Sequence, residues 1–479
     1  MKKLLTIFIF LNIPILVFSQ ERNITLEDLW KNHTFYPKSI SGFNSMNDGE
    51  HYSTMEKIDN HQQIIKYKFV NGKKVLTIFN SKDFELPKIN EYEFSQNEKK
   101  ILLKTEKEKI YRHSSKAIYY IYNVFTDKIK KLSDKKVMHA TFSHDAEKIA
   151  YVQNNNLYVK DLRSQVTTQI TNDGEKNKII NGTSDWVYEE EFGLVRAFEW
   201  SPDGKHIAYY KFDETNVKDF SMDIFGNGLY PSQEVFKYPK AGEDNSIVKI
   251  YVYNLKKDKH HYIYTEKDYE YYPRIKWTNN ADLLVLYGMN RHQNELDFII
   301  TDVIKNTNHT LFTEKDKYYI DIHDNLTFLP DNNFIWTSEK DGFNHIYKIN
   351  MTTGEEAQLT SGNWEVTSVY GMNEKSKSIY FQAAKDDPTK REVYSLSKKG
   401  TVTKLSTKSG NNRAEFSKGF KYYLHWNTDA NTPAHITLNS SKGKEIKVLE
   451  DNKPLIDTLK TFDISPKEFF TVKGKNGDD

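Results

Sequence analysis

A short phrase recurs along the chain: an aromatic residue, a small or polar residue, a polar turn and then a run of apolar residues. The copy at 200–204 reads Trp-Ser-Pro-Asp-Gly and leads into the apolar residues 207–210. Asp-Gly and Asn-containing turns permit the positive φ angles that a tight hairpin needs. Each copy therefore predicts a β-hairpin. Clear copies begin at Phe94, Phe142, Trp200, Trp277, Phe328 and Phe416, and weaker copies lie at 45–55 and 373–381.

The spacing between copies predicts the architecture. From Phe94 the aromatic positions are 48, 58, 77 and 51 residues apart, and the 88 residues between Phe328 and Phe416 equal two repeats of 44. A period of ~45–50 residues is the length of a four-stranded propeller blade, and such blades stack in a closed ring because one alone cannot bury both faces. We therefore expect an all-β fold, an eight-bladed β-propeller over residues 45–449. Two unrelated β domains are the alternative, which the phased turns disfavour.

Two steps are longer than the others and predict insertions. The 58-residue step holds residues 181–198, and the 77-residue step holds residues 213–248. Insertions carry function more often than strands, which are occupied with packing. We therefore expect the functional residues on these two segments.

The N-terminus has the pattern of a secretory signal peptide over residues 1–19, followed by an N-terminal segment over 20–44. Two lysines precede an apolar run over 4–18, and a small residue, Ser19, ends it. A membrane anchor is the alternative, but 15 apolar residues span only ~22 Å as a helix, less than the ~30 Å core of a bilayer. We expect an exported, bacterial protein, located in the periplasm or secreted, with no membrane span after signal cleavage.

The C-terminal residues 450–479 are interpreted as a linker and the first strand of a further domain. We expect a short helix over 456–461 and a strand over 469–473, followed by Asn-Gly at 476–477. Asn-Gly is a strong hairpin signal, yet no returning strand follows before Asp479. A frayed tail is the alternative.

Composition excludes several classes of function. Lys plus Arg is 68 and Asp plus Glu is 66, a net charge of +2, which argues against nucleic acid as a partner. The absence of cysteine excludes disulfides, thiol nucleophiles and cysteine zinc sites. The sequence has no G-x-S-x-G, H-E-x-x-H, P-loop or G-x-G-x-x-G, and its 15 histidines are scattered. We therefore expect no catalytic residue, no metal and no cofactor in this chain.

The sharpest local feature is the segment 185–192, Asp-Trp-Val-Tyr-Glu-Glu-Glu-Phe, on the first insertion. One interpretation is a solvated helix start, which the helix dipole favours. The other is a site for a cation: adjacent carboxylates repel each other, and a bound ammonium relieves that repulsion. The three N–H donors of a free amino terminus match two or three carboxylate oxygens.

This acidic segment, together with Trp-Ser-Pro-Asp-Gly at 200–204, Tyr-Pro-Lys-Ala-Gly at 238–242 and Val-Leu-Glu-Asp-Asn at 448–452, resembles the dipeptidyl peptidase IV family of prolyl oligopeptidase-like serine peptidases. The resemblance implies an eight-bladed propeller capped by an α/β-hydrolase domain. That domain carries a Ser-Asp-His triad and removes dipeptides with Pro or Ala in second position. Residues 450–479 would then be the start of a hydrolase domain that is missing here. Whether this chain alone is an enzyme stays open, because the triad cannot be assigned in it.

The resemblance also implies the site residues and partners. The last two glutamates of the acidic segment, Glu190 and Glu191, would clamp the amino terminus of a peptide substrate. Arg112, in a segment that resembles the one that holds the peptide carbonyl, is the third substrate-binding candidate; a plain surface cation is the alternative. A second arginine expected from a later blade has no counterpart near 319–323. Peptides with a free N-terminus are the expected partners, and a homodimer is the expected full-length form.

These observations lead to two functional hypotheses. The first is the substrate-gating, N-terminus-recognising propeller of a secreted dipeptidyl aminopeptidase that releases X-Pro or X-Ala dipeptides, cut before its catalytic domain. The second is a stand-alone secreted propeller that binds peptides or proteins without catalysis.

Overall fold

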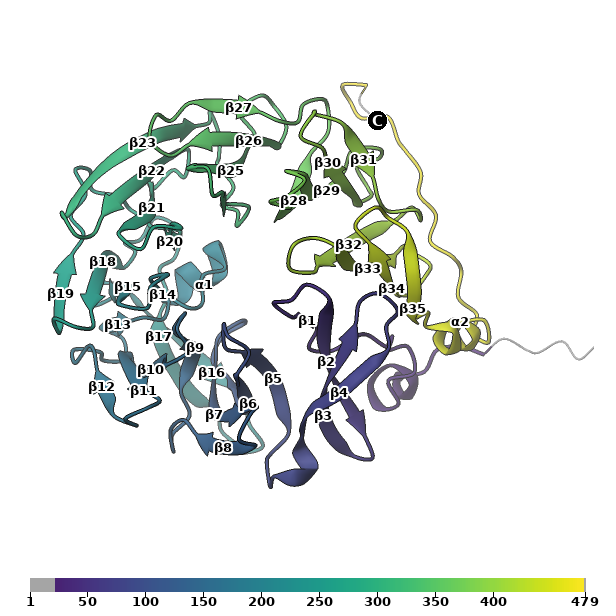
Figure 1. Cartoon of the computed structure of the whole chain (residues 1–479), viewed down its shortest axis with the longest axis horizontal. Helices are drawn as coiled ribbons and strands as arrows, with labels where there is room; N and C mark the ends of the chain where they lie inside the picture. Colours follow the sequence, from purple (N-terminus) through teal and green to yellow (C-terminus); the bar gives the residue numbers. More distant parts are fainter. Residues whose placement is uncertain (1–21, 478–479) are drawn as a thin grey trace, which may run out of the picture.

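The computed structural model describes residues 22–477 and shows eight β-sheets arranged as blades around a central axis (Figure 1). Each blade is built from consecutive antiparallel strands, with the first strand innermost. The predicted eight-bladed β-propeller is therefore confirmed. The predicted signal peptide over 1–19 lies outside the described residues.

The strands follow the blades in chain order. Blades 1 to 4 comprise β1 (Asn44–Ser45), β2 (His51–Ile58), β3 (His61–Lys68), β4 (Lys74–Asn80); β5 (Ile89–Phe94), β6 (Lys100–Lys109), β7 (Ser115–Asn123), β8 (Lys128–Lys131); β9 (Met138–Phe142), β10 (Lys148–Gln153), β11 (Asn156–Asp161), β12 (Thr167–Gln169); and β13 (Ile179–Asn181), β14 (Phe198–Trp200), β15 (His206–Asp213), β18 (Ile247–Asn254), β19 (Lys259–Tyr262). Blades 5 to 8 comprise β20 (Ile275–Trp277), β21 (Leu283–Met289), β22 (Glu295–Asp302), β23 (Thr307–Lys315); β24 (Thr327–Phe328), β25 (Asn333–Ser338), β26 (His345–Asn350), β27 (Glu356–Gln358); β28 (Val366–Met372), β29 (Ile379–Ala383), β30 (Glu392–Leu396), β31 (Val402–Lys404); and β32 (Asn411–Phe416), β33 (Tyr422–Thr428), β34 (His435–Ser440), β35 (Glu445–Glu450). Two short helical turns, η1 (Glu27–Lys31) and η2 (Ser81–Asp83), lie before β1 and after β4.

The recurring phrase of the sequence forms the turn between the first and second strands of a blade. Its serine closes the turn: the Ser201 hydroxyl accepts the backbone N–H of His206 at 2.9 Å, and Ser143 accepts that of Lys148 at 3.0 Å. Successive connections of an antiparallel sheet alternate between its two ends. These turns therefore lie at one face of the ring, while the connections between second and third strands lie at the opposite face.

Central strands are buried because each blade packs against a neighbour on both faces. In β21, residues 284–289 are all buried, whereas the three residues of the outer strand β12 are all exposed. A continuous apolar run in a short strand is the sequence pattern of such two-sided burial. The largest apolar cluster joins blades 4, 5 and 6, and smaller clusters join the other neighbouring blades.

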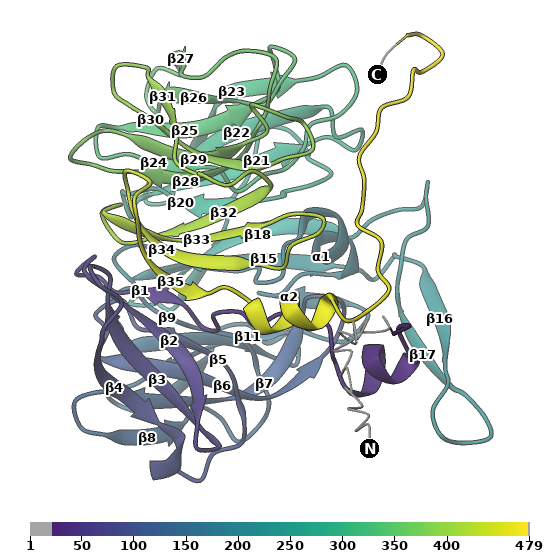
Figure 2. The same cartoon turned by 90° about the vertical axis from the view of Figure 1, so that its right-hand side faces the viewer.

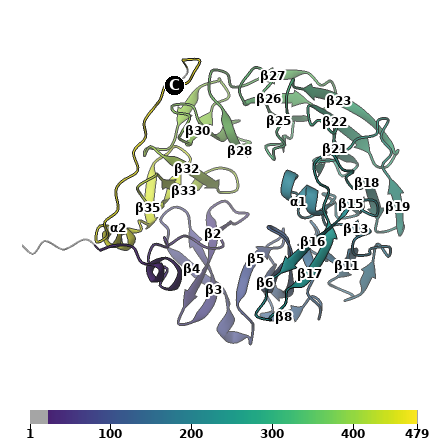
Figure 3. The ribbon, with the colours of Figure 1, turned by 180° about the vertical axis from the view of Figure 1, so that it is seen from behind.

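The ring closes between blades 8 and 1 without a shared strand. Phe69 and Tyr422 stack with their ring centroids 5.4 Å apart, and the Lys418 N–H donates to the Ser45 hydroxyl at 2.9 Å. The terminal segments add a second connection, because Arg22 forms a parallel bridge with Phe462. Figure 3 shows the closed ring from behind.

Both predicted insertions belong to blade 4. β13 and β14 both pair with β15, so the innermost strand of this blade is interrupted, and helix α1 (Trp186–Phe192) fills the interruption. Between β15 and β18, the strands β16 (Asp219–Ile224) and β17 (Ser232–Lys237) form a separate two-stranded hairpin, which we call the arm. Figure 2 shows the arm projecting from the ring.

The C-terminal predictions need correction. The helix over 456–461 is observed as α2 (Lys453–Leu459), which begins earlier because proline is well tolerated in the first turn, where Pro454 lies. Residues 469–473 form no strand. Phe469 and Phe470 are exposed, and a strand without a neighbour leaves its backbone groups unpaired. Within residues 22–477, no helix is long and apolar enough to cross a membrane.

Candidate functional site

Helix α1 carries the acidic segment, and its ends are fixed by local chemistry. The Asp185 side chain caps the helix by accepting the N–H of Tyr188 at 2.9 Å. Gly193 ends it in the left-handed conformation, at φ 60°, which glycine adopts without strain. The helix lies toward the centre of the ring in Figures 1 and 3.

Buried polar side chains tie α1 to two other blades and to the arm. The Ser246 hydroxyl, at the root of the arm, donates to Asp185 Oδ2 at 2.6 Å. The Tyr272 N–H, before blade 5, donates to the Tyr188 hydroxyl at 2.8 Å. A carboxylate oxygen of Glu189 accepts two backbone N–H groups from the β6–β7 connection of blade 2. The position of the helix is therefore fixed from three sides.

The three consecutive glutamates have three different environments. Glu189 is 1% exposed and bound to blade 2. The Glu190 side chain is 16% exposed, and its Oε2 lies 3.2 Å from Nε of Arg112. Glu191 is exposed, and within residues 22–477 its side chain makes no ion pair or hydrogen bond. Glu191 is thus open to a ligand, and Glu190 is partly exposed beside Arg112.

Arg112, on the β6–β7 connection, comes from a different blade than the glutamates. Its side chain is 72% exposed, and within residues 22–477 its Nη groups make no hydrogen bond. The structure thus brings Arg112 and Glu190 together, with Glu191 the next residue on the helix. An ion pair with so exposed a partner contributes little to stability.

Two tyrosines that no sequence pattern marks, Tyr271 and Tyr319, lie close enough to Glu191 to feel its charge. Burial raises the pKa of Tyr271 above its usual range, and the Glu270 and Glu191 carboxylates raise it further. Burial also raises the pKa of Tyr319, with Asp321 and Glu191 contributing. Arg291 lowers the pKa of Tyr271 and pairs with Glu270 at 3.0 Å.

A pocket of about 230 Å³ lies beside Tyr319, between the connections of blades 5, 6 and 7. Carboxylates dominate its charged lining, which includes Asp321, Glu339 and Glu365. Burial raises the pKa of Glu339, and neighbouring carboxylates, Asp321 foremost, raise it further. The segment 319–323 carries no arginine, as the sequence indicates, so this region is acidic.

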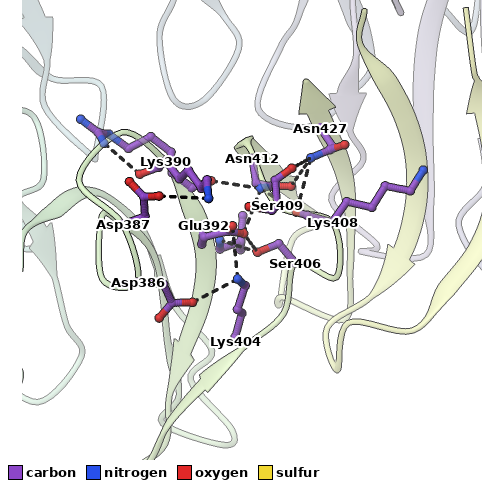
Figure 4. A network of polar contacts seen from close by, with 12 residues as sticks. Asp386, Asp387, Lys390, Glu392, Lys404, Ser406, Lys408, Ser409, Asn412 and Asn427 are labelled. Carbon is purple, nitrogen blue, oxygen red and sulfur yellow. Dashed lines mark hydrogen bonds and ion pairs between the residues drawn. The ribbon is translucent and has the colours of Figure 1, made fainter. Parts of the chain in front are cut away.

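Another buried carboxylate, Glu392, joins blades 7 and 8 (Figure 4). Its Oε2 accepts the Asn412 side-chain N–H at 2.9 Å, and its Oε1 lies 3.2 Å from Nζ of Lys404. The Glu392 carboxylate therefore has its partners within the propeller and is not a candidate for ligand binding. Within residues 22–477, no group of histidine and acidic side chains is arranged to hold a metal ion.

Comparisons with known proteins agree with this architecture. The sequence model of the dipeptidyl peptidase IV (DPP IV) N-terminal region matches residues 95–434. The chain is 28% identical to prolyl endopeptidase FAP of Bos taurus over 495 residues, covering 95% of this chain and 63% of the bovine protein. It is also 28% identical over 484 residues to dipeptidyl peptidase 4 of Trichophyton tonsurans, covering 95% of this chain and 61% of the fungal protein.

Among solved structures, the crystal structure of Porphyromonas gingivalis dipeptidyl peptidase 4 superposes with a TM-score of 0.90 and 36% identity. The match covers 96% of this chain and 66% of that one. The chain thus spans less than two thirds of these two curated relatives. The family model covers most of the propeller, including α1 and the arm. The chain therefore belongs to the family of the dipeptidyl peptidase IV N-terminal region.

Proposed function

We propose that this chain is the substrate-gating, N-terminus-recognising propeller of an exported serine-type dipeptidyl aminopeptidase. Its catalytic domain would follow the propeller and release X-Pro and X-Ala dipeptides. The observation that carries the proposal is the pairing of Arg112 with Glu190, beside a Glu191 that has no partner within residues 22–477. The names of the matched relatives, which are peptidases, support it.

The chemistry of these groups suits a peptide amino terminus. An ammonium group has three N–H donors, and Glu190 and Glu191 offer oxygens that can accept them in charge-assisted hydrogen bonds. The surrounding carboxylates near Tyr319 add negative charge, which attracts a cation. Arg112 keeps its Nη donors for the first peptide carbonyl.

A clamp of this kind would also act as a ruler. Because the ammonium is held at a fixed place remote from the scissile bond, only a substrate with two residues before that bond would reach a nucleophile correctly. Helix α1 lies toward the centre of the ring (Figure 1), and on this proposal it would block a longer N-terminal extension.

The proposal includes location and assembly. The signal-like pattern over 1–19 supports export to a bacterial periplasm or to the medium. We also propose a homodimer for the full-length form, with the arm as the contact between copies. The alternative function is a stand-alone secreted propeller that binds peptides or proteins without catalysis.

Two observations separate the hypotheses. On the leading proposal, the coding sequence past Asp479 encodes a G-x-S-x-G and, further on, an aspartate and a histidine. The purified chain ending at Asp479 then hydrolyses no dipeptide amide, because it has neither a nucleophile nor an oxyanion hole. Inhibitor-sensitive turnover by that chain, or a stop codon after Asp479 with a stable product, would overturn this proposal.

The test of the clamp uses the full-length enzyme. Glu190→Gln and Glu191→Gln keep side-chain volume and remove charge. For each variant we expect kcat/KM for a free-amine dipeptide amide to fall by an amount that corresponds to a loss of about 2–4 kcal/mol of transition-state stabilisation. Thermal denaturation should change little, because relieving carboxylate repulsion costs the folded state nothing. Wild-type kinetics in both variants would refute the clamp.

A further inference from the structure

The geometry points to Glu189 as the residue that positions Arg112 for the peptide carbonyl. Glu189 does not touch substrate in this account; it acts through the β6–β7 connection that carries the arginine. The inference rests on the proposed function where it assigns Arg112 to a substrate. It separates Glu189 from the two glutamates that follow it in the same acidic run.

Two hydrogen bonds carry the inference. Glu189 Oε1 accepts the N–H of His113 at 2.7 Å and the N–H of Ser114 at 2.8 Å. These are the two residues directly after Arg112, and they lie more than 70 residues from the helix in the sequence. One buried oxygen therefore binds the backbone that holds the arginine.

The connection itself is a closed turn. The Ile110 N–H donates to the Ser114 carbonyl at 3.0 Å, and the Tyr111 N–H donates to the Ser114 hydroxyl at 3.2 Å. Because the turn is internally bonded, holding His113 and Ser114 also holds the Cα of Arg112. The Arg112 side chain is mostly exposed, and the one ion pair it makes within residues 22–477 is with Glu190, so its own packing does not fix it.

The buried Glu189 carboxylate and its two N–H donors depend on each other for stability. A buried carboxylate is costly unless hydrogen bonds satisfy it, and bonds from N–H groups to a charged oxygen are stronger than neutral ones. Ser114 is also buried, so removing the acceptor leaves its amide without a partner. Glu189 thus sets both the distance and the orientation between α1 and the blade 2 turn.

The first readout is independent of catalysis. In the full-length protein, we expect the amides of His113 and Ser114 to be protected from hydrogen exchange. Glu189→Ala should remove that protection, and Glu189→Gln, which keeps an oxygen acceptor of the same reach, should retain part of it. Arg112→Ala should leave it intact. Glu147→Ala, which removes an exposed carboxylate in a turn at the opposite face, is the matched control.

The second readout is kinetic. A misplaced binding group of this kind costs about 10- to 100-fold in rate. We therefore expect Glu189→Ala to lower kcat/KM for a free-amine dipeptide amide by about that factor, with partial rescue in Glu189→Gln. The double variant Glu189→Ala, Arg112→Ala should be no worse than Arg112→Ala alone, because both changes remove one function.

The outcomes divide cleanly. Protected His113 and Ser114 amides in both Glu189 variants would overturn the inference whatever the activity. Lost protection combined with additive kinetic effects would also overturn it, because Glu189 would then act independently of Arg112. Should Glu189→Ala fail to fold, Glu189→Gln provides the test. Reduced amide protection together with reduced kcat/KM would support the inference, and wild-type values of both would overturn it. A wild-type enzyme that released no dipeptides would contradict the proposed function. The exchange data would still test whether Glu189 holds the backbone of His113 and Ser114.

Discussion

Glu214 is a buried carboxyl group at the root of the arm, where β15 ends and the arm begins. Burial, with the nearby Asp185 carboxylate, raises its pKa to about 7 against the opposing effect of Lys237. Burial also raises the pKa of Asp185, against the hydrogen bonds from Ser246 and Tyr188. Two carboxyl groups that resist ionisation thus lie where α1 and the arm meet.

This arrangement predicts a pH-dependent stability. Because the pKa of Glu214 is higher in the folded than in the unfolded state, its contribution to stability is present below pH ~4.5 and is lost as the pH rises through ~7. Glu214→Gln should therefore stabilise the chain at pH 8 by up to about 3 kcal/mol and have little effect at pH 5. Urea unfolding at the two pH values measures this.

The control for that experiment is Glu147→Gln, an exposed carboxyl group in a turn at the other face. It should shift stability equally at both pH values. If Glu214→Gln kept the wild-type dependence between pH 5 and pH 8, the carboxyl group would not be the cause.

Some residues of the candidate site could be predicted from the sequence, and others could not. A helix start in the segment 185–192 and the choice of Glu190 and Glu191 as candidates follow from local residue types and a family motif. The role of Glu189 does not, because its partners are backbone amides of a distant blade that no side-chain pattern marks. Tyr271 and Tyr319 were missed for the same reason: only the closed ring brings them to α1.

The arm is a separate hairpin that does not belong to the repeating blades of the propeller. Among the described residues its strands pair only with each other, and its tip exposes Phe225 at 81%, Leu229 at 98% and Tyr230 at 87%. Its root is well held, because Tyr238 contacts Trp186 of α1 with ring centroids 4.2 Å apart. A rigid root with an apolar tip is the form expected of a contact with another protein surface.

If the arm joins two copies, charging its tip should separate them. We expect Phe225→Asp combined with Leu229→Asp to convert a dimeric full-length protein to a monomer, because burying unpaired carboxylates at an apolar contact is unfavourable. Light scattering after size-exclusion chromatography measures the mass. Phe125→Asp, at an exposed aromatic residue on the turn after β7, should leave the mass unchanged. An unchanged mass in the arm variant would exclude the arm as the dimer contact.

Hairpins were predictable where the turn chemistry is local. The serine of the recurring phrase accepts an N–H five residues later, so the signal and its consequence lie in one short segment. The strand expected at 469–473 is not observed. A strand needs a neighbouring strand to pair with, and no local sequence pattern guarantees one. Its apolar residues are exposed instead.

The described residues form a ring, and the segment at Arg22 meets the segment at Phe462 beside its closure. The repeat length predicted the number of blades, because seven of the eight are contiguous units of four strands and blade 4 differs only by its two insertions. The closure between blades 8 and 1 was not predictable, since it depends on side chains such as Phe69 and Tyr422 that are distant in sequence. The ring also brings Arg112 of blade 2 to Glu190 of blade 4, across blade 3.

The central claim is that this ring recognises a free amino terminus. The most direct measurement is the ratio of kcat/KM for a free-amine dipeptide amide to that for its N-acetylated form, in the full-length enzyme and in the double variant Glu190→Gln, Glu191→Gln. Acetylation removes the positive charge that the carboxylates bind. We expect a wild-type ratio of at least about 100 and a fall toward one in the variant, as the loss of a charge-assisted contact requires. A ratio that is the same in both enzymes would contradict the account.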